Sequence, residues 1–372
     1  MPSKSRYLRA SVLRDVARKM VFVAGPRQVG KTTFARSLPG GKAGYLSWDD
    51  PEDRQLILAR ELPPSRLWVF DELHKYRRWR NYLKGIGDKR PAGQGIVVTG
   101  SARLDYYRFG GDSLQGRYHH FRMHPLSVAE LKLRTNRDLA ELLALGGFPE
   151  PFFSGSEVEA RRWSRQYRTL LVREEVSDLE SVHDLGTLEL LALRLPELVG
   201  SPLSINALRE DLEVSHRTLG KWLDILERLY SLFRVTPFGA PKLRAVKKSR
   251  KHYHFDWTLV REPGLRFENL VAAHLLKWVH FQQDELGLDL DLRFFRDVDG
   301  REVDFVVMDG RAPVLLVECK WADDSVSPAL RYLKSRFPAA EAWQISATGK
   351  RDYQSAEGIR VAPAIGLLKT WV

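Results

Sequence analysis

The feature that most constrains this chain is a glycine loop near its amino end. An apolar run leads into the loop and a helix-forming segment follows it: Val21-Phe22-Val23-Ala24, then Gly25-Pro26-Arg27-Gln28-Val29-Gly30-Lys31-Thr32, then Thr33 to Leu38. A strand, a loop and a helix start in this order are what a phosphate-binding loop requires. A chance match in a glycine-rich turn would not need the flanking strand and helix patterns. The sequence therefore predicts a nucleoside-triphosphate site in an α/β fold.

Each part of this loop has a predicted role. Gly25 and Gly30 permit backbone angles that a Cβ would forbid, so successive N–H groups can face a polyphosphate. Lys31 is expected to contact the β- and γ-phosphates, and the Thr32 hydroxyl to ligate Mg²⁺. The expected cofactors are therefore ATP and Mg²⁺. The predicted binding set is Gly25, Pro26, Arg27, Gln28, Val29, Gly30, Lys31, Thr32, Thr33 and, from the next motif, Asp71.

A second motif follows an apolar strand, Leu67-Trp68-Val69-Phe70, which ends in Asp71-Glu72. Four apolar residues in a row predict a strand buried on both faces of a parallel sheet. Ligands bind at the carboxyl ends of such strands. Asp71 is expected to hold Mg²⁺, and Glu72 to polarise the water that attacks the γ-phosphate. The alternative is that the two acids only cap a helix.

Two further residues are candidates for catalysis. The apolar strand Gly95 to Thr99 is followed by Gly100-Ser101, and Thr99 or Ser101 is placed to contact the γ-phosphate or the attacking water. We select Ser101, which lies just beyond the strand; the alternative is that it caps the next helix. Arg117 follows a glycine and is predicted to stabilise transition-state charge, in cis or from a neighbouring subunit. The alternative for Arg117 is a plain surface arginine.

Charge and cysteine content limit the partners and the compartment. The net charge of +12 favours a polyanionic partner such as nucleic acid or an acidic membrane surface, although solubility alone would also explain it. The single cysteine, Cys319, excludes an internal disulfide and fits a reducing compartment. The sequence has no signal-peptide pattern and no run of roughly 20 uncharged apolar residues. We therefore expect a cytoplasmic protein that does not enter a membrane.

The region from Leu188 to Asp256 predicts a DNA-binding arrangement. A short helix from Ser204 and a longer one from Ser215 are in helix-turn-helix order, with His216, Arg217 and Lys221 facing outward. A hairpin wing with a basic tip is expected after them. Its cations would contact phosphates without reading sequence, or they would form only a solvated face, and the helices only a packing module. The basic residues of this wing are Lys242, Arg244, Lys247, Lys248, Arg250 and Lys251.

The carboxyl-terminal region contains a second acidic motif. Asp304 precedes a strand that ends in Glu318 and Lys320, and this layout resembles the PD-(D/E)XK nuclease superfamily. Residues two apart on a strand share a face, so Glu318 and Lys320 are expected on one side. With Glu268 as a third ligand, the acids would bind a second Mg²⁺ or Mn²⁺, and Lys320 would orient water. The motif is short, so catalysis at this site stays open.

Taken in order, the motifs resemble one family. They are Gly25 to Thr32, Phe70-Asp71-Glu72-Leu73-His74-Lys75, Thr99-Gly100-Ser101, Gly116-Arg117, Pro125-Leu126-Ser127 and Gly146-Gly147-Phe148-Pro149. The series is similar to the bacterial and archaeal AAA+ ATPases that carry a C-terminal DUF4143 domain. The resemblance implies an AAA+ core, a helical lid, a winged-helix region and a nuclease-like end. It also implies a homo-oligomer, typically a hexamer-like ring with ATP between subunits.

The predicted domains are an ATPase core at 1–126, a helical lid at 127–185, a winged helix-turn-helix at 186–260 and a nuclease-like DUF4143-type domain at 261–372. The favoured function is an ATP-hydrolysing AAA+ machine that binds and remodels or processes DNA. One alternative is a nucleotide-gated regulatory switch whose C-terminal domain is not catalytic. The other is a metal-dependent nuclease licensed by ATP.

Overall fold

The computed structural model describes residues 5–100, 114–175, 184–238 and 250–372. Its internal contacts divide the chain into two compact units, which are described separately. Unit 1 comprises Met1–Pro125 with Asp284–Leu286, and unit 2 comprises Leu126–Gln283 with Gly287–Val372. Five of the predicted site residues lie outside the described residues, namely Ser101, Lys242, Arg244, Lys247 and Lys248.

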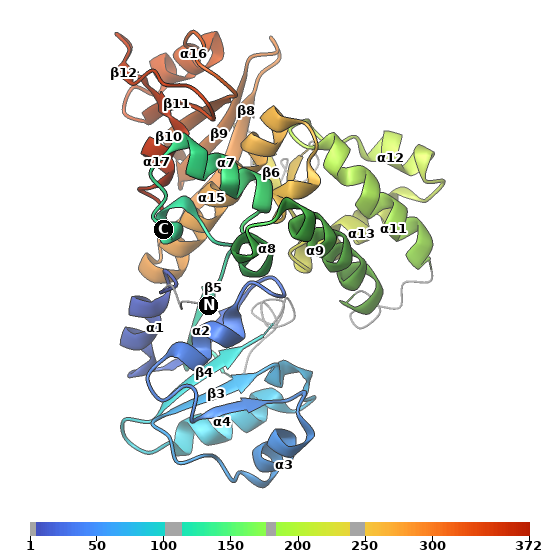
Figure 1. Cartoon of the computed structure of the whole chain (residues 1–372), viewed down its shortest axis with the longest axis vertical. Helices are drawn as coiled ribbons and strands as arrows, with labels where there is room; N and C mark the ends of the chain where they lie inside the picture. The colour runs from blue at the N-terminus through green and yellow to red at the C-terminus, as the bar shows by residue number, and fades with distance from the viewer. Residues whose placement is uncertain (1–4, 101–113, 176–183, 239–249) are drawn as a thin grey trace. The chain divides into compact units, whose positions relative to one another are not determined.

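Unit 1 is built on a five-stranded sheet, coloured blue to cyan in Figure 1. The strand order is β2-β3-β4-β1-β5, and every neighbouring pair is parallel. All carboxyl ends therefore lie at one edge, where the glycine loop follows β1. This parallel sheet confirms the predicted α/β class. The strands are β1 (Met20–Ala24), β2 (Tyr45–Ser47), β3 (Leu67–Asp71), β4 (Gly95–Thr99) and β5 (Tyr118–Arg122).

The helices of unit 1 cover this sheet, and the start of α3 is fixed by its capping residue. Asp50 caps α3, since its carboxylate accepts hydrogen bonds from the N–H groups of Glu52 (2.9 Å) and Asp53 (3.1 Å). Trp79, Leu83 and Ile86 lie at helical spacing and pack into the core under the sheet. The helices are α1 (Arg9–Val16), α2 (Lys31–Ser37), α3 (Pro51–Ala59), η1 (Leu73–Lys75) and α4 (Trp79–Lys89).

Unit 2 contains an eight-stranded sheet in the order β12-β13-β11-β10-β9-β8-β6-β7. The middle strands β8, β9 and β10 are antiparallel, and β10, β11 and β13 are parallel. The strands are β6 (Leu232–Pro237), β7 (Lys251–His254), β8 (Leu290–Arg296), β9 (Glu302–Asp309), β10 (Ala312–Lys320), β11 (Glu341–Ser346), β12 (Tyr353–Gln354) and β13 (Arg360–Pro363). With them lie α15 (Pro263–Leu286), α16 (Pro328–Arg336) and α17 (Ala364–Leu368).

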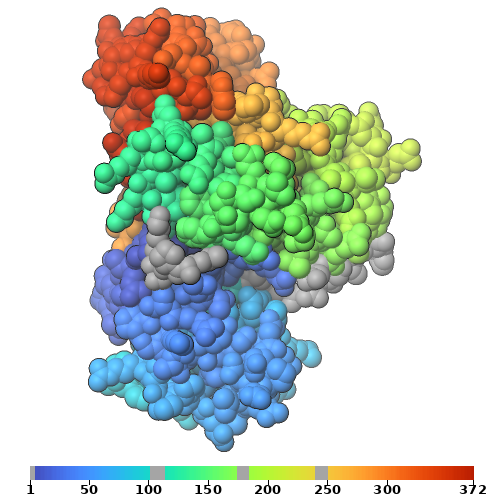
Figure 2. All heavy atoms as spheres, viewed as in Figure 1, coloured from blue at the N-terminus to red at the C-terminus, as the bar shows by residue number. Residues whose placement is uncertain are grey.

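The remaining helices of unit 2, apart from the short η5, occupy residues 128–228 and form the green to yellow-green surface in Figure 2. Ser204 and Ser215 cap α12 and α13 as predicted, because their hydroxyls accept the N–H groups of Ala207 (3.3 Å) and Thr218 (3.0 Å). The helices are α6 (Val128–Leu131), α7 (Asn136–Leu145), α8 (Pro149–Ser154), α9 (Glu157–Leu170) with its continuation η3 (Leu171–Glu175), α11 (Leu185–Arg194), η4 (Leu195–Leu198), α12 (Ile205–Asp211), α13 (His216–Arg228) and η5 (Trp257–Leu259).

The predicted wing differs from the observed structure. The two strands do pair as an antiparallel hairpin, with Val235 opposite Lys251. However, β6 also pairs in parallel with β8, so the hairpin is part of the eight-stranded sheet. The predicted hairpin is therefore confirmed, but its strands belong to the same sheet as those of the region predicted at 261–372, because hydrogen bonds to a later strand were not visible in the local pattern. Within the ranges that the structure describes, no helix has the length and apolar character needed to cross a membrane.

Candidate nucleotide site and C-terminal acid cluster

The glycine loop between β1 and α2 has the backbone that its sequence predicts. Gly25 and Gly30 have φ values of 150° and 95°, in the region that favours glycine. A Cβ at Gly25 would lie 2.2 Å from the carbonyl oxygen of Met123. The loop can therefore pass the end of β5 only if residue 25 has no side chain.

The ammonium of Lys31 lies inside this loop. Its Nζ donates hydrogen bonds to the carbonyl oxygens of Gly25 (3.0 Å) and Pro26 (2.6 Å), and the side chain is buried. Phosphate oxygens can replace these two carbonyl acceptors without displacing the lysine from the loop. The glycine backbone and the enclosed cation thus fit a polyphosphate.

Asp71 is the centre of a hydroxyl network at the carboxyl edge of the sheet. Its Oδ2 accepts hydrogen bonds from Thr32 Oγ1 (2.7 Å) and Tyr45 OH (2.7 Å), and its Oδ1 accepts one from Thr99 Oγ1 (2.5 Å). Since β4 lies between β1 and β3, Thr99 reaches Asp71 from the intervening strand. Thr32 and Asp71 are thus brought together as predicted, and their oxygens are of the kind that Mg²⁺ prefers.

Glu72 has a different environment from its neighbour. Its backbone is left-handed (φ 54°), a conformation that is uncommon outside glycine. Its Oε2 is buried and accepts no hydrogen bond from the described residues. The imidazole Nε2 of His74 lies 3.6 Å from this oxygen, and the ammonium Nζ of Lys75 lies 3.8 Å from it. Burial raises the pKa of Glu72, and Lys31 and Lys75 oppose that shift. Glu72 is therefore an acceptor that the protein leaves available.

Two residues in this site escaped the sequence prediction. Tyr45 opens β2, and only its hydrogen bond to Asp71 shows its place in the site; burial and that bond raise its pKa. Arg6 is buried and donates to the carbonyl oxygens of Val29 (2.6 Å) and His124 (2.5 Å). It thereby fixes the glycine loop to the end of β5. The available signal was the run of basic residues between Arg6 and Lys19 near the amino end of the sequence.

Arg117 lies at the wrong edge of the sheet for the predicted role in cis. Its carbonyl oxygen accepts the N–H of Met20, the first residue of β1, at 3.1 Å. The five residues of β1 separate this position from the glycine loop, at about 3.3 Å each. Its guanidinium is paired with Asp88 at 2.9 Å. The role in cis was therefore wrong, and a role in a neighbouring subunit stays a prediction.

The basic residues predicted to contact DNA differ in their exposure to solvent. His216, Arg217 and Lys221 are exposed on α13, as expected. Arg250 is half-buried, while Lys251 is only 1% exposed and pairs with Glu302 at 2.5 Å. The prediction that Lys251 belongs to an exposed basic tip was wrong. Lys251 is the first residue of β7, the last strand in the order of the sheet, and its side chain is buried.

The predicted nuclease residues lie near one another in unit 2, but each has a protein partner. Glu268 accepts the hydroxyl of Tyr253 (2.6 Å), Asp304 accepts the N–H of Cys319 (2.8 Å), and Glu318 pairs with Lys320 (3.0 Å). Among residues 5–100, 114–175, 184–238 and 250–372, no group of three or more His, Cys, Asp or Glu side chains is arranged to hold a metal. The three acids as they stand do not fit the predicted second metal ion.

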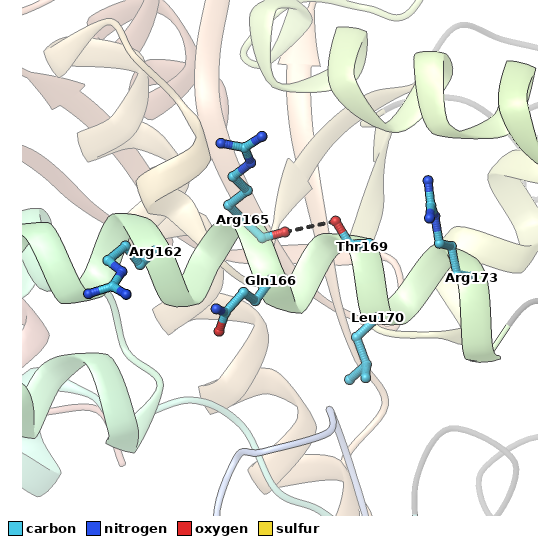
Figure 3. Close-up of a pocket in the computed structure, with 6 residues that line it drawn as sticks. All are labelled: Arg162, Arg165, Gln166, Thr169, Leu170 and Arg173. Atoms are coloured by element: carbon cyan, nitrogen blue, oxygen red, sulfur yellow. Dashed lines mark hydrogen bonds between the residues drawn. The ribbon is translucent and has the colours of Figure 1, made fainter.

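A hollow of about 530 Å³ lies along α9 and η3. Figure 3 shows Arg165 and Arg173 extending to one side of the helix and Leu170 to the other. Arg162 pairs with Glu159 (2.9 Å), and Arg173 pairs with Glu189 (2.5 Å). The residues that line the hollow include no carboxylate, so it offers neither a magnesium ligand nor a base. They are Arg162, Arg165, Gln166, Thr169, Leu170 and Arg173.

Comparison with known families agrees with the motifs. Residues 17–132 match the family described as AAA domain, and residues 263–365 match the domain of unknown function DUF4143. The chain is an AAA+ protein with a C-terminal DUF4143 domain. The resemblance stated from the sequence is thereby confirmed. Residues 136–263 match a further domain of unknown function, DUF8612, which spans both the predicted lid and the predicted helix-turn-helix. The boundary between those two regions stays a prediction.

Curated relatives are distant. Uncharacterized proteins of Mycobacterium tuberculosis and Mycobacterium bovis are 26% identical over 256 residues, covering 66% of this chain. The match spans only 55% of their own length. An uncharacterized protein of Haemophilus influenzae is 22% identical over 348 residues, covering 82% of this chain and 84% of the relative.

Among solved structures, a Thermotoga maritima RuvB variant aligns with a TM-score of 0.27 and 18% identity, covering 61% of this chain and 86% of its own. A signal-transduction ATPase with numerous domains from Pyrococcus horikoshii aligns with a TM-score of 0.22 and 15% identity, covering 73% and 46%. Both TM-scores are below 0.5, so the fold assignment rests on the sheet topology and the family matches.

Proposed function

We propose that this protein hydrolyses ATP at the glycine loop and uses the turnover to act on DNA as a homo-oligomer. The observation that carries the ATPase assignment is the contact of Thr32 with Asp71, next to Glu72, whose buried Oε2 accepts no hydrogen bond from the described residues. It joins a phosphate loop, a magnesium position and a base at one edge of the sheet. Family membership supports the same assignment.

Each residue of the nucleotide site has a separate role in ATP hydrolysis. Lys31 binds phosphate oxygens, and Thr32 and Asp71 hold Mg²⁺, which neutralises phosphate charge when bound with ATP. Tyr45 and Thr99 keep the Asp71 carboxylate in one orientation. Glu72 orients the attacking water and accepts its proton, because its Oε2 accepts no hydrogen bond from the described residues.

ATP turnover and ATP binding test this assignment together. Lys31→Ala is expected to abolish both, whereas Glu72→Gln is expected to abolish turnover and retain bound ATP. Lys42→Ala, at an exposed lysine in the same unit, is the matched control. Near-normal turnover in both site variants would refute the assignment, as would calorimetry that detects no ATP binding to the folded wild type.

The DNA proposal rests on α13 and on net charge. His216, Arg217 and Lys221 are exposed near the start of α13, and the chain carries a net charge of +12. Contacts of this kind are made to phosphates and weaken as salt rises. Arg217→Ala with Lys221→Ala should weaken duplex binding and reduce its salt dependence, while Arg336→Ala on α16 should not. Equal binding by both would contradict a role for α13.

The homo-oligomer proposal rests on family membership and on Arg117, which is too far from its own glycine loop to act there. Sedimentation velocity with and without ATP tests the assembly. If Arg117 acts in a neighbouring site, mixing Arg117→Ala with Lys31→Ala protein should restore turnover, because each subunit supplies what the other lacks. A monomer at all nucleotide concentrations would refute this proposal.

A nucleotide-gated switch is the second candidate. It is favoured by the C-terminal acids, each of which already has a protein partner. A switch whose last domain only binds a partner needs no metal there. ATPase rates with and without duplex DNA separate the candidates, since a DNA-driven machine is expected to turn over faster with DNA.

A further inference from the structure

The acid cluster of unit 2 consists of Glu268 on α15, Glu302 and Asp304 on β9, and Glu318 on β10. Strand periodicity predicts that Glu302 and Asp304 share a face. A fifth charged residue, absent from the predicted motif, enters this cluster. It is Lys251, the first residue of β7.

Lys251 is an ammonium enclosed by carboxylates. Its Nζ lies 2.5 Å from Glu302 Oε1 and 3.5 Å from Glu268 Oε1, and the side chain is 1% exposed. The ring of Phe294 covers it, with Nζ 5.4 Å from the ring centroid. A lysine buried this deeply stays charged only when acids surround it. Burial opposes its charge, but Glu268, Asp304 and Glu302 outweigh burial and raise the pKa of Lys251.

The position of Lys251 is fixed by the sheet. Its backbone lies opposite Val235 of β6, and β6 is held in turn by β8. The side chain therefore cannot turn outward unless the sheet edge opens. A divalent ion coordinated by Glu268 and Asp304 would have to enter beside this ammonium and would be repelled by it.

The other ligand atoms are also engaged. Tyr253 donates to the same Glu268 oxygen that faces Lys251, and the Cys319 N–H donates to Asp304. Glu318 Oε1 pairs with Lys320, while Glu318 Oε2 is buried without a hydrogen bond from the described residues. One oxygen of Glu318 cannot form a metal site by itself, because the neighbouring acids Glu302, Glu268 and Asp304 already have protein partners.

We propose that the ammonium of Lys251 is the resident cation of this acid cluster and excludes a divalent metal, so that the DUF4143 domain does not cut nucleic acid by a metal mechanism. The inference is independent of the ATPase, because it concerns only residues of unit 2.

Manganese binding to the full chain without nucleotide tests the proposal, measured by electron paramagnetic resonance. Wild type and Asp304→Asn should bind Mn²⁺ equally, because the cluster takes no metal in either. Lys251→Met should gain one Mn²⁺ site, with an affinity at least tenfold higher than that of any Mn²⁺ binding by the wild type. Adding Asp304→Asn should remove this site. Lys277→Met is the matched control, since Lys277 is also 1% exposed and paired with an acid, Glu130, outside this cluster.

Two outcomes would overturn the proposal. One is a wild-type manganese site that Asp304→Asn abolishes. The other is a folded Lys251→Met protein that gains no site. If Lys251→Met does not fold, Lys251→Met with Glu302→Gln removes the charge pair together and takes its place in the same measurement. Circular dichroism of each variant establishes folding.

Discussion

Two groups of carboxylates in this protein lie on or beside the strands of a sheet, yet their surroundings differ in kind. In unit 1, Asp71 is held by three hydroxyls, and Glu72 keeps a buried oxygen that accepts no hydrogen bond from the described residues. In unit 2, the acids surround a buried ammonium. Hydroxyls orient a carboxylate and leave its charge for an incoming cation, whereas an internal lysine neutralises it. The residue types alone do not distinguish the two arrangements.

The largest expected effect concerns the lysine in unit 2. Lys251→Met leaves buried acids without their cation and should lower the free energy of unfolding by about 3–5 kcal/mol. Adding Glu302→Gln should recover part of the loss, because the uncompensated charge is then removed. Denaturant unfolding of the full chain measures both. If adding Glu302→Gln to Lys277→Met recovered the same amount of stability, Lys251 and Glu302 would not be a specific pair.

The next effect separates the two sites by activity. Glu72→Gln should lower ATP turnover at least 100-fold, about 2.7 kcal/mol of transition-state stabilisation, because no general base remains. Asp304→Asn should leave ATP turnover within about twofold of the wild-type rate, because Asp304 is not part of the nucleotide site and does not act as the base for ATP hydrolysis. Steady-state phosphate release measures both. A large loss of ATP turnover in Asp304→Asn would contradict the conclusion that only the acids of unit 1 take part in ATP hydrolysis.

Removing a hydroxyl from Asp71 should have a smaller effect. Thr99→Val deletes a fully buried donor to a carboxylate and should cost about 2 kcal/mol of stability, with a higher magnesium requirement for turnover. Tyr45→Phe removes a half-buried donor and should cost about 1 kcal/mol. Unfolding measurements and magnesium titrations of turnover check both. An unchanged magnesium requirement in both variants would show that the network does not orient Asp71.

The smallest expected effect is a shift in pH dependence. Glu72 must be ionised to accept a proton, so turnover should fall as pH drops through its pKa. Burial raises this pKa above the ordinary value of 4.5, while Lys31 and Lys75 oppose the rise. Lys75→Met removes one opposing charge and should move the acid limb to higher pH. A pH–rate profile with the acid limb unchanged would exclude Lys75 from setting the pKa of Glu72.

The glycine loop and the Asp71–Glu72 pair were predictable from the sequence, because a strand, a loop and a helix start are local. Tyr45 and Arg6 were not, since each reaches the site through contacts with residues more than 20 positions away. Lys251 was misassigned for a related reason. It ends a basic run that resembles a solvent-exposed loop, and only the pairing of β6 with β8 places it inside a sheet.

The eight-stranded sheet of unit 2 crosses a family boundary. Strands β6 and β7 belong to the DUF8612 match, whereas β8 to β13 lie in the DUF4143 match. A fragment cut at residue 263 would expose the unpaired backbone of β6 on one side and of β8 on the other, and such bare edges promote aggregation. The two matched regions thus form one folding unit. A protein that had only one of them would have a sheet with an unpaired edge strand.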